Sequence, residues 1–440
     1  MLDTLSQLAA DGVARAKKLG ANEAFVVIRR NAKTEIQRRD GKTERIVESV
    51  ARSMAVQLYV DGRYSAQTTT DLRPEAIDAF LGDAIALTRA LEPDPHRSIT
   101  DPALFPRAQA ALESDDAALA AGLSAADREA WVATMEAHAR KHDNVISATA
   151  NLTYERSMGA CATSNGFAGT SQGTHIAPSV DVTLRDEGDK RAEDGDYAWT
   201  RFVGDLPSAA SIGDNAIRMA STRLGAKKGP TLKGTMIVDP RAAGMLIGRL
   251  LGPATGNALQ QGRSFWAGKL GQKVLSDKLS IVDDPLLARG LGSRPFDGEG
   301  IAAARLPIIE AGSLKNAYVD TYYGKKGGMA PTTGSASNRV VSLGDKDLAG
   351  WIAAVGNGVL VTSWLGGNAD ANTGDFSFGM RGHLVEKGQV GGPIGEMNVT
   401  GNFITLFAGL AGLGNDPWRY SSTLCPTLVF EGVQFSGAKA

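Results

Sequence analysis

The chain has 440 residues, of which 43% are hydrophobic and 22% charged, and this length predicts roughly two or three soluble domains with a sizeable core. Its 47 basic and 48 acidic residues give a net charge of −1, so charge gives no reason to expect a nucleic acid or an anionic membrane as a partner. Two cysteines, Cys161 and Cys425, and an N-terminus without a long apolar core argue against a disulfide framework and a signal peptide, and predict a cytoplasmic protein.

The first hundred residues alternate between helical and extended patterns. Apolar residues recur at helical spacing in the first twenty residues, and Pro74 opens a second helix that runs to Leu91. Between these helices we expect strands at 24–29, 34–39 and 47–60, with Asp40-Gly41 as a turn. The segment 1–110 is therefore predicted to be an α+β unit, and residues 92–118 read as a linker.

The next segment, 111–225, repeats this mixture. Ser124 caps a helix over 125–141, and a further helix runs from Pro207 to Leu224. The strands predicted between them cover 144–153, 158–165, 167–173 and 176–185, and the acidic stretch 186–196 reads as a turn. Asn165-Gly166 is a strong hairpin signal, and 225–229 is the expected domain boundary.

The C-terminal segment, 226–440, is rich in glycine and short strands. A strand at 234–238 precedes a helix over Pro240–Leu251, whose apolar sequence predicts packing into a core, and a second helix is expected over 254–261. Further strands begin at Val359 and Phe376, and 386–389 reads as a hairpin turn. Gly391-Gly392-Pro393 is expected to interrupt the extended structure, and the last strand is expected over 427–430. The apolar run 403–413 is too short to span a bilayer. The fold class is α+β, with an N-terminal α+β lobe of antiparallel sheets and flanking helices and a β-dominated C-terminal lobe.

The histidines offer one pattern for a metal. His138 and His142 lie four residues apart on a predicted helix and share a face, although a solvated helix end is the favoured interpretation in the absence of a third ligand. His175 and His383 lie in predicted strands, where single histidines are usually structural or surface residues.

The C-terminal half carries an ordered series of segments that points to a family. They are RSFWAGKLGQ from Arg263, RPFDGEG from Arg294, IIEAGSLKNAYVDTYYGKK from Ile308, GDFSF from Gly374, HLVEKGQV from His383 and GPIGEMNVTGN from Gly392. In order and spacing the chain resembles the TldD/PmbA metallopeptidase family, also called modulators of DNA gyrase, and within it the PmbA (or TldE) branch.

The resemblance implies a two-subunit cytosolic metallopeptidase that trims unfolded peptides. In such an enzyme the TldD-like subunit binds zinc through an HExxxH helix and a cysteine in a loop before the last strand. The corresponding helix here, Pro240–Leu251, has neither His nor Glu, and the chain contains no His-Glu dipeptide. Cys425 stands directly before Pro426, displaced from the loop 415–424, and reads as a buried structural cysteine. No catalytic residue, metal ligand or cofactor is therefore expected in this chain, and zinc is expected in the partner subunit.

The same resemblance suggests side chains that contact substrate. Aromatic and amide groups suit capture of an extended peptide, although ordinary strand-edge and turn chemistry would place the same residue types there. The candidates are Tyr318, Tyr322, Tyr323, Asn338, Arg339, Asn368, Asn372 and Asp375.

The expected function is thus that of a PmbA/TldE-like subunit that forms the chamber and holds substrate beside a TldD-like catalytic subunit. The glycine-rich lobe, including Trp351, Trp364 and Phe376, is the expected contact surface, and a homodimer is an option for the isolated chain. Two alternatives stay open: a standalone homo-oligomeric peptidase or hydrolase with an unrecognised site, and a DNA gyrase modulator, against which the near-neutral charge argues.

Overall fold

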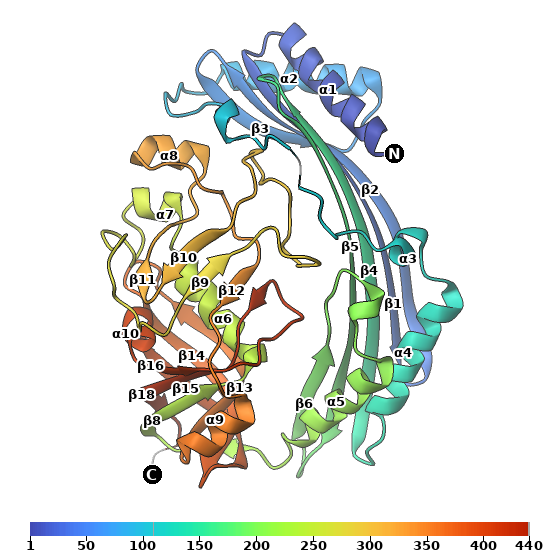
Figure 1. The fold of residues 1–440 in the computed structure, drawn as a ribbon. Coiled ribbons are helices and arrows are strands. Elements are labelled where there is room, and N and C mark those ends of the chain that lie inside the picture. The colour runs from blue at the N-terminus through green and yellow to red at the C-terminus, as the bar shows by residue number, and fades with distance from the viewer. Residues whose placement is uncertain (109, 439–440) are drawn as a thin grey trace.

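The N-terminal lobe is built on one long antiparallel sheet. The computed structural model describes residues 1–108 and 110–438, and the strand order of this sheet is β3-β2-β1-β4-β5-β6 (Figure 1). Its strands are β1 (Glu23–Arg39), β2 (Lys42–Val60), β3 (Arg63–Thr69), β4 (Val145–Thr163), β5 (Ala168–Arg185) and β6 (Arg191–Tyr197). The segments 1–110 and 111–225 contribute three strands each, so their strands share a single sheet.

The central strands are longer than their sequence suggests. β4 and β5 run for 19 and 18 residues without interruption, so the prediction of two shorter strands in each place was wrong. The reason is that β4 pairs with β1 on one side and with β5 on the other. Hydrogen bonds to two neighbouring strands stabilise the extended conformation even where the residue pattern of the segment does not favour a strand. Likewise, part of the predicted acidic turn is strand β6, which pairs with β5.

Four helices cover one face of this sheet. They are α1 (Leu2–Lys18), α2 (Pro74–Arg89), α4 (Ala125–Ala139) and α5 (Ala209–Ser221). The buried positions of α1, among them Leu5, Ala9 and Val13, recur every four residues, so one stripe of the helix packs on the sheet. Short turns of helix lie at η1 (Pro102–Leu104), α3 (Ala117–Ala121) and η2 (Val203–Asp205). The opposite face of the sheet contacts the C-terminal lobe, where Phe167 packs edge-on against Phe296 at 5.1 Å between ring centroids.

The C-terminal lobe contains a ring of strands that closes on itself. The ring runs through β8 (Leu232–Val238), β13 (Gly358–Ala369), β14 (Asp375–Glu386), β15 (Gln389–Asn402) and β18 (Leu428–Ser436), and β15 also pairs with β18 to close it. Two short strands, β7 (Lys227–Lys228) and β16 (Leu410–Leu413), extend its margins. The expected break at Gly391–Pro393 is wrong, because β15 continues through it and places an irregularity in the ladder opposite, between His383 and Val385.

Helix α6 (Pro240–Leu251) packs into this lobe and has the bounds that the sequence predicted. Leu246, Ile247 and Leu250 are fully buried in the same core as Phe407 and Phe430. Burial of each such side chain contributes about 1.5–3 kcal/mol relative to leaving it exposed. The core-packing prediction for this helix is therefore confirmed for its inner face.

A second, smaller sheet and four short helices complete the lobe. The sheet has the order β11-β10-β9-β12-β17, with strands β9 (Ile281–Asp283), β10 (Leu306–Glu310), β11 (Ser313–Leu314), β12 (Arg339–Val341) and β17 (Thr423–Leu424). The helices are α7 (Gly256–Gln260), α8 (Thr321–Gly327), α9 (Leu348–Val355) and α10 (Phe403–Ala408). The apolar run 403–413 is thus divided between α10 and β16. Across residues 1–108 and 110–438, no helix is both long enough and apolar enough to cross a membrane.

Candidate functional site

A cleft separates the two lobes beside α6. Strands β5 and β6 line it on one side, and the N-terminal half of α6 and strand β13 line it on the other. The cavity measures about 490 Å³ and is rimmed by acidic, aromatic and methionine side chains. It is the point where the helix singled out in the sequence meets the N-terminal lobe, so its chemistry decides what α6 can do.

The start of α6 is fixed by its own sequence. The side chain of Asp239 accepts a hydrogen bond from the Arg241 backbone N–H at 2.9 Å, and Pro240 occupies the first turn. Burial raises the pKa of Asp239, and the bond from the Arg241 backbone opposes that rise. This cap directs Arg241, Ala242 and Met245 toward the cleft while the following apolar residues point into the core. The apolar sequence of this helix predicts a core position, and the structure adds that its first turn borders the cleft.

Arg241 places a positive charge at the cleft end of α6, where it forms an ion pair with Asp196. Its Nη1 lies 2.9 Å from Asp196 Oδ1, and both side chains are mostly buried. The guanidinium carbon lies 4.7 Å from the ring centroid of Trp418 and 5.5 Å from that of Tyr197. Because these rings add cation–π stabilisation, the arginine is held by both lobes and by the C-terminal loop.

Arg223 also links the lobes, through an ion pair within its own lobe and a hydrogen bond to β13. Arg223 contacts Asp194 at 2.7 Å and donates a hydrogen bond from Nη2 to Ser363 Oγ at 3.1 Å. Arg223 is 6% exposed, so this pair is buried at the junction between β6 and β13. Asp181, which lines the same cavity, has its pKa raised by burial and by the charge of Asp194.

The residues around α6 do not fit a zinc site. A zinc ion would need several histidine, cysteine or carboxylate ligands, whereas the cleft face of α6 carries the Arg241 cation. Cys425 is fully buried, and its Sγ lies 3.5 Å from the carbonyl oxygen of Pro426. Burial raises the pKa of the Cys425 thiol far above its usual value, so it stays protonated. Among the described residues, no group of three or more His, Cys, Asp and Glu could hold a metal ion.

His138 and His142 do not act as a pair in this fold. His138 Nδ1 lies 2.9 Å from Asp214 Oδ1 on α5, which ties α4 to α5. His142 lies beyond the end of α4 and accepts a hydrogen bond from the Asn144 backbone N–H at 3.1 Å. Each imidazole thus has a local structural role, in agreement with the helix-end interpretation.

A larger cavity of about 600 Å³ lies higher in the cleft, around Arg201 and His175. Arg201 is 6% exposed and donates to four backbone carbonyls, three of them from a loop of the C-terminal lobe. These are Gly290 at 2.6 Å, Leu291 at 3.0 Å, Ser293 at 3.1 Å and Ser114 at 3.4 Å. Among the described residues Arg201 has no carboxylate partner, so hydrogen bonds to backbone carbonyls of both lobes hold its guanidinium.

We expect His175 to make the protein less stable in acid. Burial, and then the positive charge of Arg201, lower the pKa of His175 to about 4, whereas an unfolded chain takes up this proton near pH 6.5. Between these values the unfolded state binds more protons, so the free energy of unfolding should fall as the pH drops from 6.5 to 4, by about 2 kcal/mol for this residue. Urea titrations at several pH values give the free energy of unfolding as a function of pH. This free energy should change less with pH in His175→Gln than in the wild type, and as much as in the wild type in His142→Gln. Equal slopes in all three proteins would contradict the prediction.

The predicted substrate side chains fall into three separate places, and three of them lie inside the C-terminal lobe. Tyr318 is 5% exposed and its hydroxyl lies 3.4 Å from Asp283, while burial raises its pKa. Asn338 is 1% exposed and bonds the backbone of Asp284 and Gly292. Arg339 is half-buried on β12, and its Nε is buried without a hydrogen-bond partner in the described structure. In this structure Tyr318 and Asn338 therefore serve internal contacts.

Two further candidates sit on α8, where it meets the N-terminal lobe. The Tyr322 hydroxyl donates to Asp94 at 2.8 Å, and the Arg97 guanidinium lies 3.5 Å above its ring. Tyr323 packs edge-on against Tyr322 at 4.8 Å. Tyr322 therefore joins the two lobes, and Tyr323 packs against it.

The last three candidates belong to the hairpin between β13 and β14. Asn368, Asn372 and Asp375 are exposed. Asp375 accepts hydrogen bonds from Thr373 in the hairpin and from Asn402 at the end of β15, at 2.9 Å each, so the hairpin is tied to the neighbouring strand. The peptide-binding role of all eight candidates stays a prediction.

Sequence reasoning missed the residues that shape the cleft. Asp196 lies in the stretch expected to be a turn, and Trp418 lies in the loop considered only for its cysteine. Arg241 stands near the start of an otherwise apolar helix, and this isolated charge is the one signal in the sequence that could have found it. Arg201 gives no local signal, because its partners are backbone carbonyls far away in the sequence.

The fold defines the class of protein first. The chain superposes on TldE from Thermococcus kodakarensis with a TM-score of 0.85 and 19% identity, covering 98% of this chain and all of the other, which shows a common fold. Family models describing the PmbA/TldA metallopeptidase central domain and C-terminal domain match residues 119–224 and 231–437. The chain therefore belongs to the PmbA/TldD metallopeptidase family.

Individual relatives cover nearly the whole chain. It is 27% identical over 423 residues to metalloprotease PmbA of Escherichia coli O157:H7, covering 94% of this chain and 92% of the relative. It is also similar to a candidate modulator of DNA gyrase from Bacteroides thetaiotaomicron, with 37% identity, a TM-score of 0.95 and 98% coverage of both chains. The resemblance found in the sequence is thus confirmed at the level of the family.

Proposed function

We propose that this chain is the PmbA/TldE-type, non-catalytic subunit of a cytosolic metallopeptidase that trims unfolded peptides, with zinc held by a TldD-like partner. The observation that carries the proposal is the Arg241–Asp196 pair at the cleft face of α6. The guanidinium of Arg241 repels a divalent cation at this position. Removing the guanidinium would leave the buried carboxylate of Asp196 without its partner. The family name supplies the reaction class, and the residues of this chain supply the reason to assign catalysis to another subunit.

In this proposal the chain forms one wall of the chamber and holds substrate there. The cleft carries aromatic, methionine and acidic side chains, which suit an extended peptide of mixed sequence. The exposed hairpin residues Asn368, Asn372 and Asp375 are the predicted peptide contacts that need no rearrangement to be reached.

The experiment compares the isolated chain with its mixture with a TldD-like subunit. We expect no stoichiometric zinc and no cleavage of an unstructured peptide by the chain alone, and both zinc and cleavage in a purified complex of the two. His138→Ala/His142→Ala should leave metal content and complex activity unchanged, because these residues tie helix ends. Stoichiometric zinc and cleavage by the isolated chain would establish a standalone peptidase, and equal activity of the partner alone would remove the supporting role.

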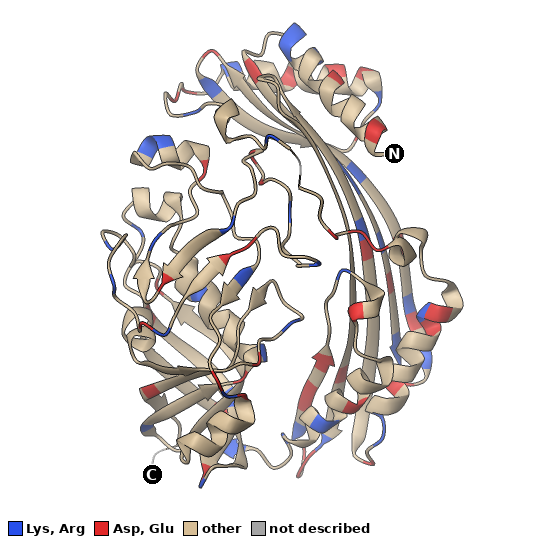
Figure 2. Ribbon diagram, viewed as in Figure 1, with Lys and Arg blue, Asp and Glu red and all other residues tan. Residues whose placement is uncertain are grey.

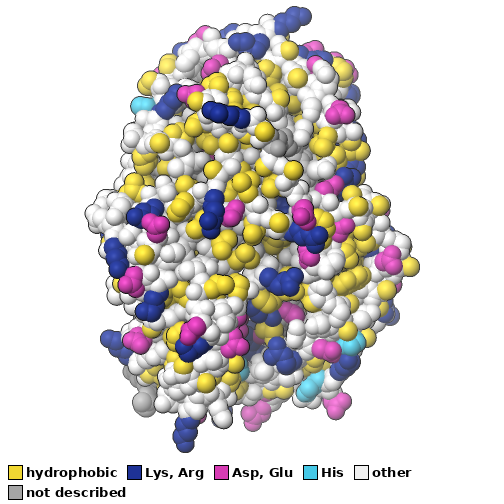
Figure 3. Space-filling model, in the orientation of Figure 1, with side chains coloured by type: hydrophobic (Ala, Val, Ile, Leu, Met, Phe, Trp, Pro, Cys, Tyr) yellow, Lys and Arg dark blue, Asp and Glu magenta, His cyan; other side chains and the backbone are white. Residues whose placement is uncertain are grey.

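The alternative function, modulation of DNA gyrase, is the one named for the Bacteroides relative, and it would require a different protein surface. Direct DNA binding needs a basic surface, whereas Figure 2 shows acidic and basic residues dispersed over both lobes, and the face in Figure 3 mixes both signs with apolar side chains. Salt-sensitive binding of duplex DNA at physiological ionic strength would favour this alternative.

A further inference from the structure

One carboxylate in the cleft beside α6 has no partner. Three aspartates line the cavity of about 490 Å³ there, and two of them are neutralised by arginines. Asp194 contacts Arg223 at 2.7 Å, whereas the partner of Asp196 is Arg241 at 2.9 Å. The third is Asp181 of β5, which is exposed, and no described residue forms an ion pair or a hydrogen bond with its side chain. The cavity therefore keeps one uncompensated negative charge.

The sheet directs the Asp181 side chain toward the cleft and leaves it uncovered. Val180 and Val182 on either side of it are buried under the helices, so Asp181 points to the opposite face, where α6 and β13 face β5 and β6 (Figure 1). Its neighbour across the ladder on β6 is Gly195. A Cβ at Gly195 would lie 2.9 Å from Asp181 Oδ1, so the absence of a side chain there keeps the carboxylate open to the cavity.

The positive charges around Asp181 already have partners. On the same face of the sheet, the ladders place Thr149 of β4 beside Asp181 and Arg39 of β1 beyond it. Arg39 Nε donates to Thr149 Oγ1 at 2.9 Å and lies 3.6 Å from Glu44. Partial burial in the cleft and the like charge of Asp194 raise the pKa of Asp181. A cation that reaches this carboxylate from the cleft would therefore stabilise its charged form.

The rest of the cavity offers apolar surface. Met245 of α6 and Trp364 of β13 line it from the C-terminal lobe, and Met219 of α5 lines it from the N-terminal lobe. Thioether and indole groups accommodate methylene groups of varied shape and add no second charge. A ligand that suits the whole cavity thus carries a positive charge at one end and an apolar stem behind it.

We propose that this cavity binds a primary ammonium group on an apolar stem, and that Asp181 is the carboxylate that contacts it. One oxygen of Asp181 lies against Gly195, which leaves a single-point contact and favours an ammonium over the two-pronged guanidinium. A divalent cation is a poorer occupant, because Asp194 and Asp196 already face arginines and one carboxylate supplies too few ligands.

The inference deepens the proposed peptide-holding role and rests on it for the source of the ammonium. In a peptide this chemistry belongs to a lysine side chain or to the amino-terminal residue. Both sources present the same charged group on an apolar stem, so the experiment has to separate them.

The first test measures peptide binding to the isolated full chain by isothermal titration calorimetry. Three pentapeptide amides share one apolar sequence and differ in charge. The first has a blocked amino terminus and a central lysine, the second a free amino terminus and a central norleucine, and the third a blocked amino terminus and a central norleucine. At least one charged peptide should bind roughly tenfold tighter than the neutral one, and the tighter of the two identifies the source. Equal dissociation constants for all three, or no binding of any of them, would overturn the proposal.

The second test assigns the contact to Asp181. Asp181→Asn keeps the shape of the side chain and removes its charge, so the charged peptides should bind no better than the neutral one, whose own dissociation constant should not change. The matched control is Glu193→Gln, which removes a charge from the same face of the sheet but outside the cavity. It should change the preference by less than about threefold. An unchanged preference in Asp181→Asn, or an equal loss in Glu193→Gln, would show that no specific contact with Asp181 exists.

Thermal unfolding gives a readout that an internal structural role of Asp181 would move in the opposite direction. Because the described structure gives this carboxylate no partner, the melting temperature of Asp181→Asn should equal or exceed that of the wild type. A clear fall would mean that a group of the chain itself already occupies the carboxylate, and would overturn the proposal.

Peptide cleavage by the complex with a TldD-like subunit separates this inference from the proposed function. Cleavage together with binding that ignores peptide charge would remove the ammonium site and leave the proposed function standing. Charge-dependent binding that requires Asp181, without cleavage by the complex, would keep the ammonium site and remove the proposed peptidase role.

Discussion

Replacing Arg201 with alanine should lower the free energy of unfolding by about 3–5 kcal/mol, because several buried carbonyls would lose charge-assisted hydrogen bonds at once. The four acceptors come from the segment around Ser114 and from the loop containing Gly290, Leu291 and Ser293. Urea unfolding followed by fluorescence and circular dichroism measures the loss, and coincidence of the two probes tests whether one free energy describes it.

Two variants sharpen this prediction. Arg201→Lys keeps the charge but cannot reproduce the planar fork, so it should recover little of the lost stability. Arg289→Ala removes exposed ion pairs to Glu113 and Asp205 in the same region and should cost at most about 1 kcal/mol. Similar small losses for Arg201→Ala and Arg289→Ala would show that the lobes are held together elsewhere.

Writing the missing motif into α6 should unfold or destabilise the chain and restore no peptidase activity. In Arg241→His/Ala242→Glu/Leu246→His, the first change removes the partner of Asp196 and the last places an imidazole where Leu246 is fully buried. Each buried polar group left without a partner costs about 1–3 kcal/mol, so a total loss of about 4 kcal/mol is expected. Cys425 is turned into the core, so the metal would also lack a ligand from the C-terminal loop.

The matched control for this graft is Met245→His, which adds one imidazole on the cleft side of the same helix. It should be tolerated with a loss of about 1 kcal/mol, because its side chain reaches the cavity. Thermal unfolding, bound zinc and peptide cleavage are compared across the variants. Zinc-dependent cleavage by the graft alone would show that an intact metal pocket survives beside α6, and that the assignment of catalysis to a partner is wrong.

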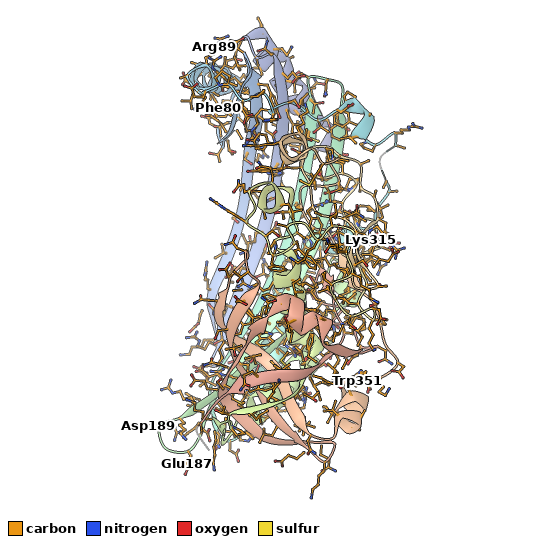
Figure 4. All side chains as sticks on the ribbon, turned by 90° about the vertical axis from the view of Figure 1, so that its left-hand side faces the viewer. Phe80, Arg89, Glu187, Asp189, Lys315 and Trp351 are labelled. Atoms are coloured by element: carbon orange, nitrogen blue, oxygen red, sulfur yellow. The ribbon has the colours of Figure 1, made fainter. Side chains whose placement is uncertain are left out.

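The expected contact surface illustrates where sequence patterns mislead. Phe376 is 6% exposed and packs within the ring of strands, so it cannot form a partner surface in this fold. Trp364 Nε1 donates to the Ala242 carbonyl, and Trp351 Nε1 donates to the Leu413 carbonyl. Both indole N–H groups therefore make hydrogen bonds within the C-terminal lobe. Trp351 lies at the outer side of the lobe in Figure 4. Composition indicates an apolar lobe but cannot separate its inner face from its outer face.

The candidate site shows the same limit. The sequence placed Tyr318, Tyr322 and Asn338 in one group because tyrosine and asparagine suit peptide capture. The fold separates them, since Asn338 bonds a loop backbone inside the lobe and Tyr322 reaches Asp94 in the other lobe. A hydroxyl or an amide serves an internal loop as well as a ligand, and only its surroundings distinguish the two.

The sequence alone determined the local elements that depend on neighbouring residues. The cap and apolar stripe of α6, the turn at Asp40-Gly41 with its positive φ angles and the absence of a His-Glu pair all follow from short segments. The tertiary structure alone decided that Arg241 meets Asp196 across the cleft, that β4 and β5 run unbroken, and that part of β2 stays unpaired. The physical reason is that backbone propensity and periodicity act over a few residues, whereas pairing, burial and charge partners depend on which distant segments meet.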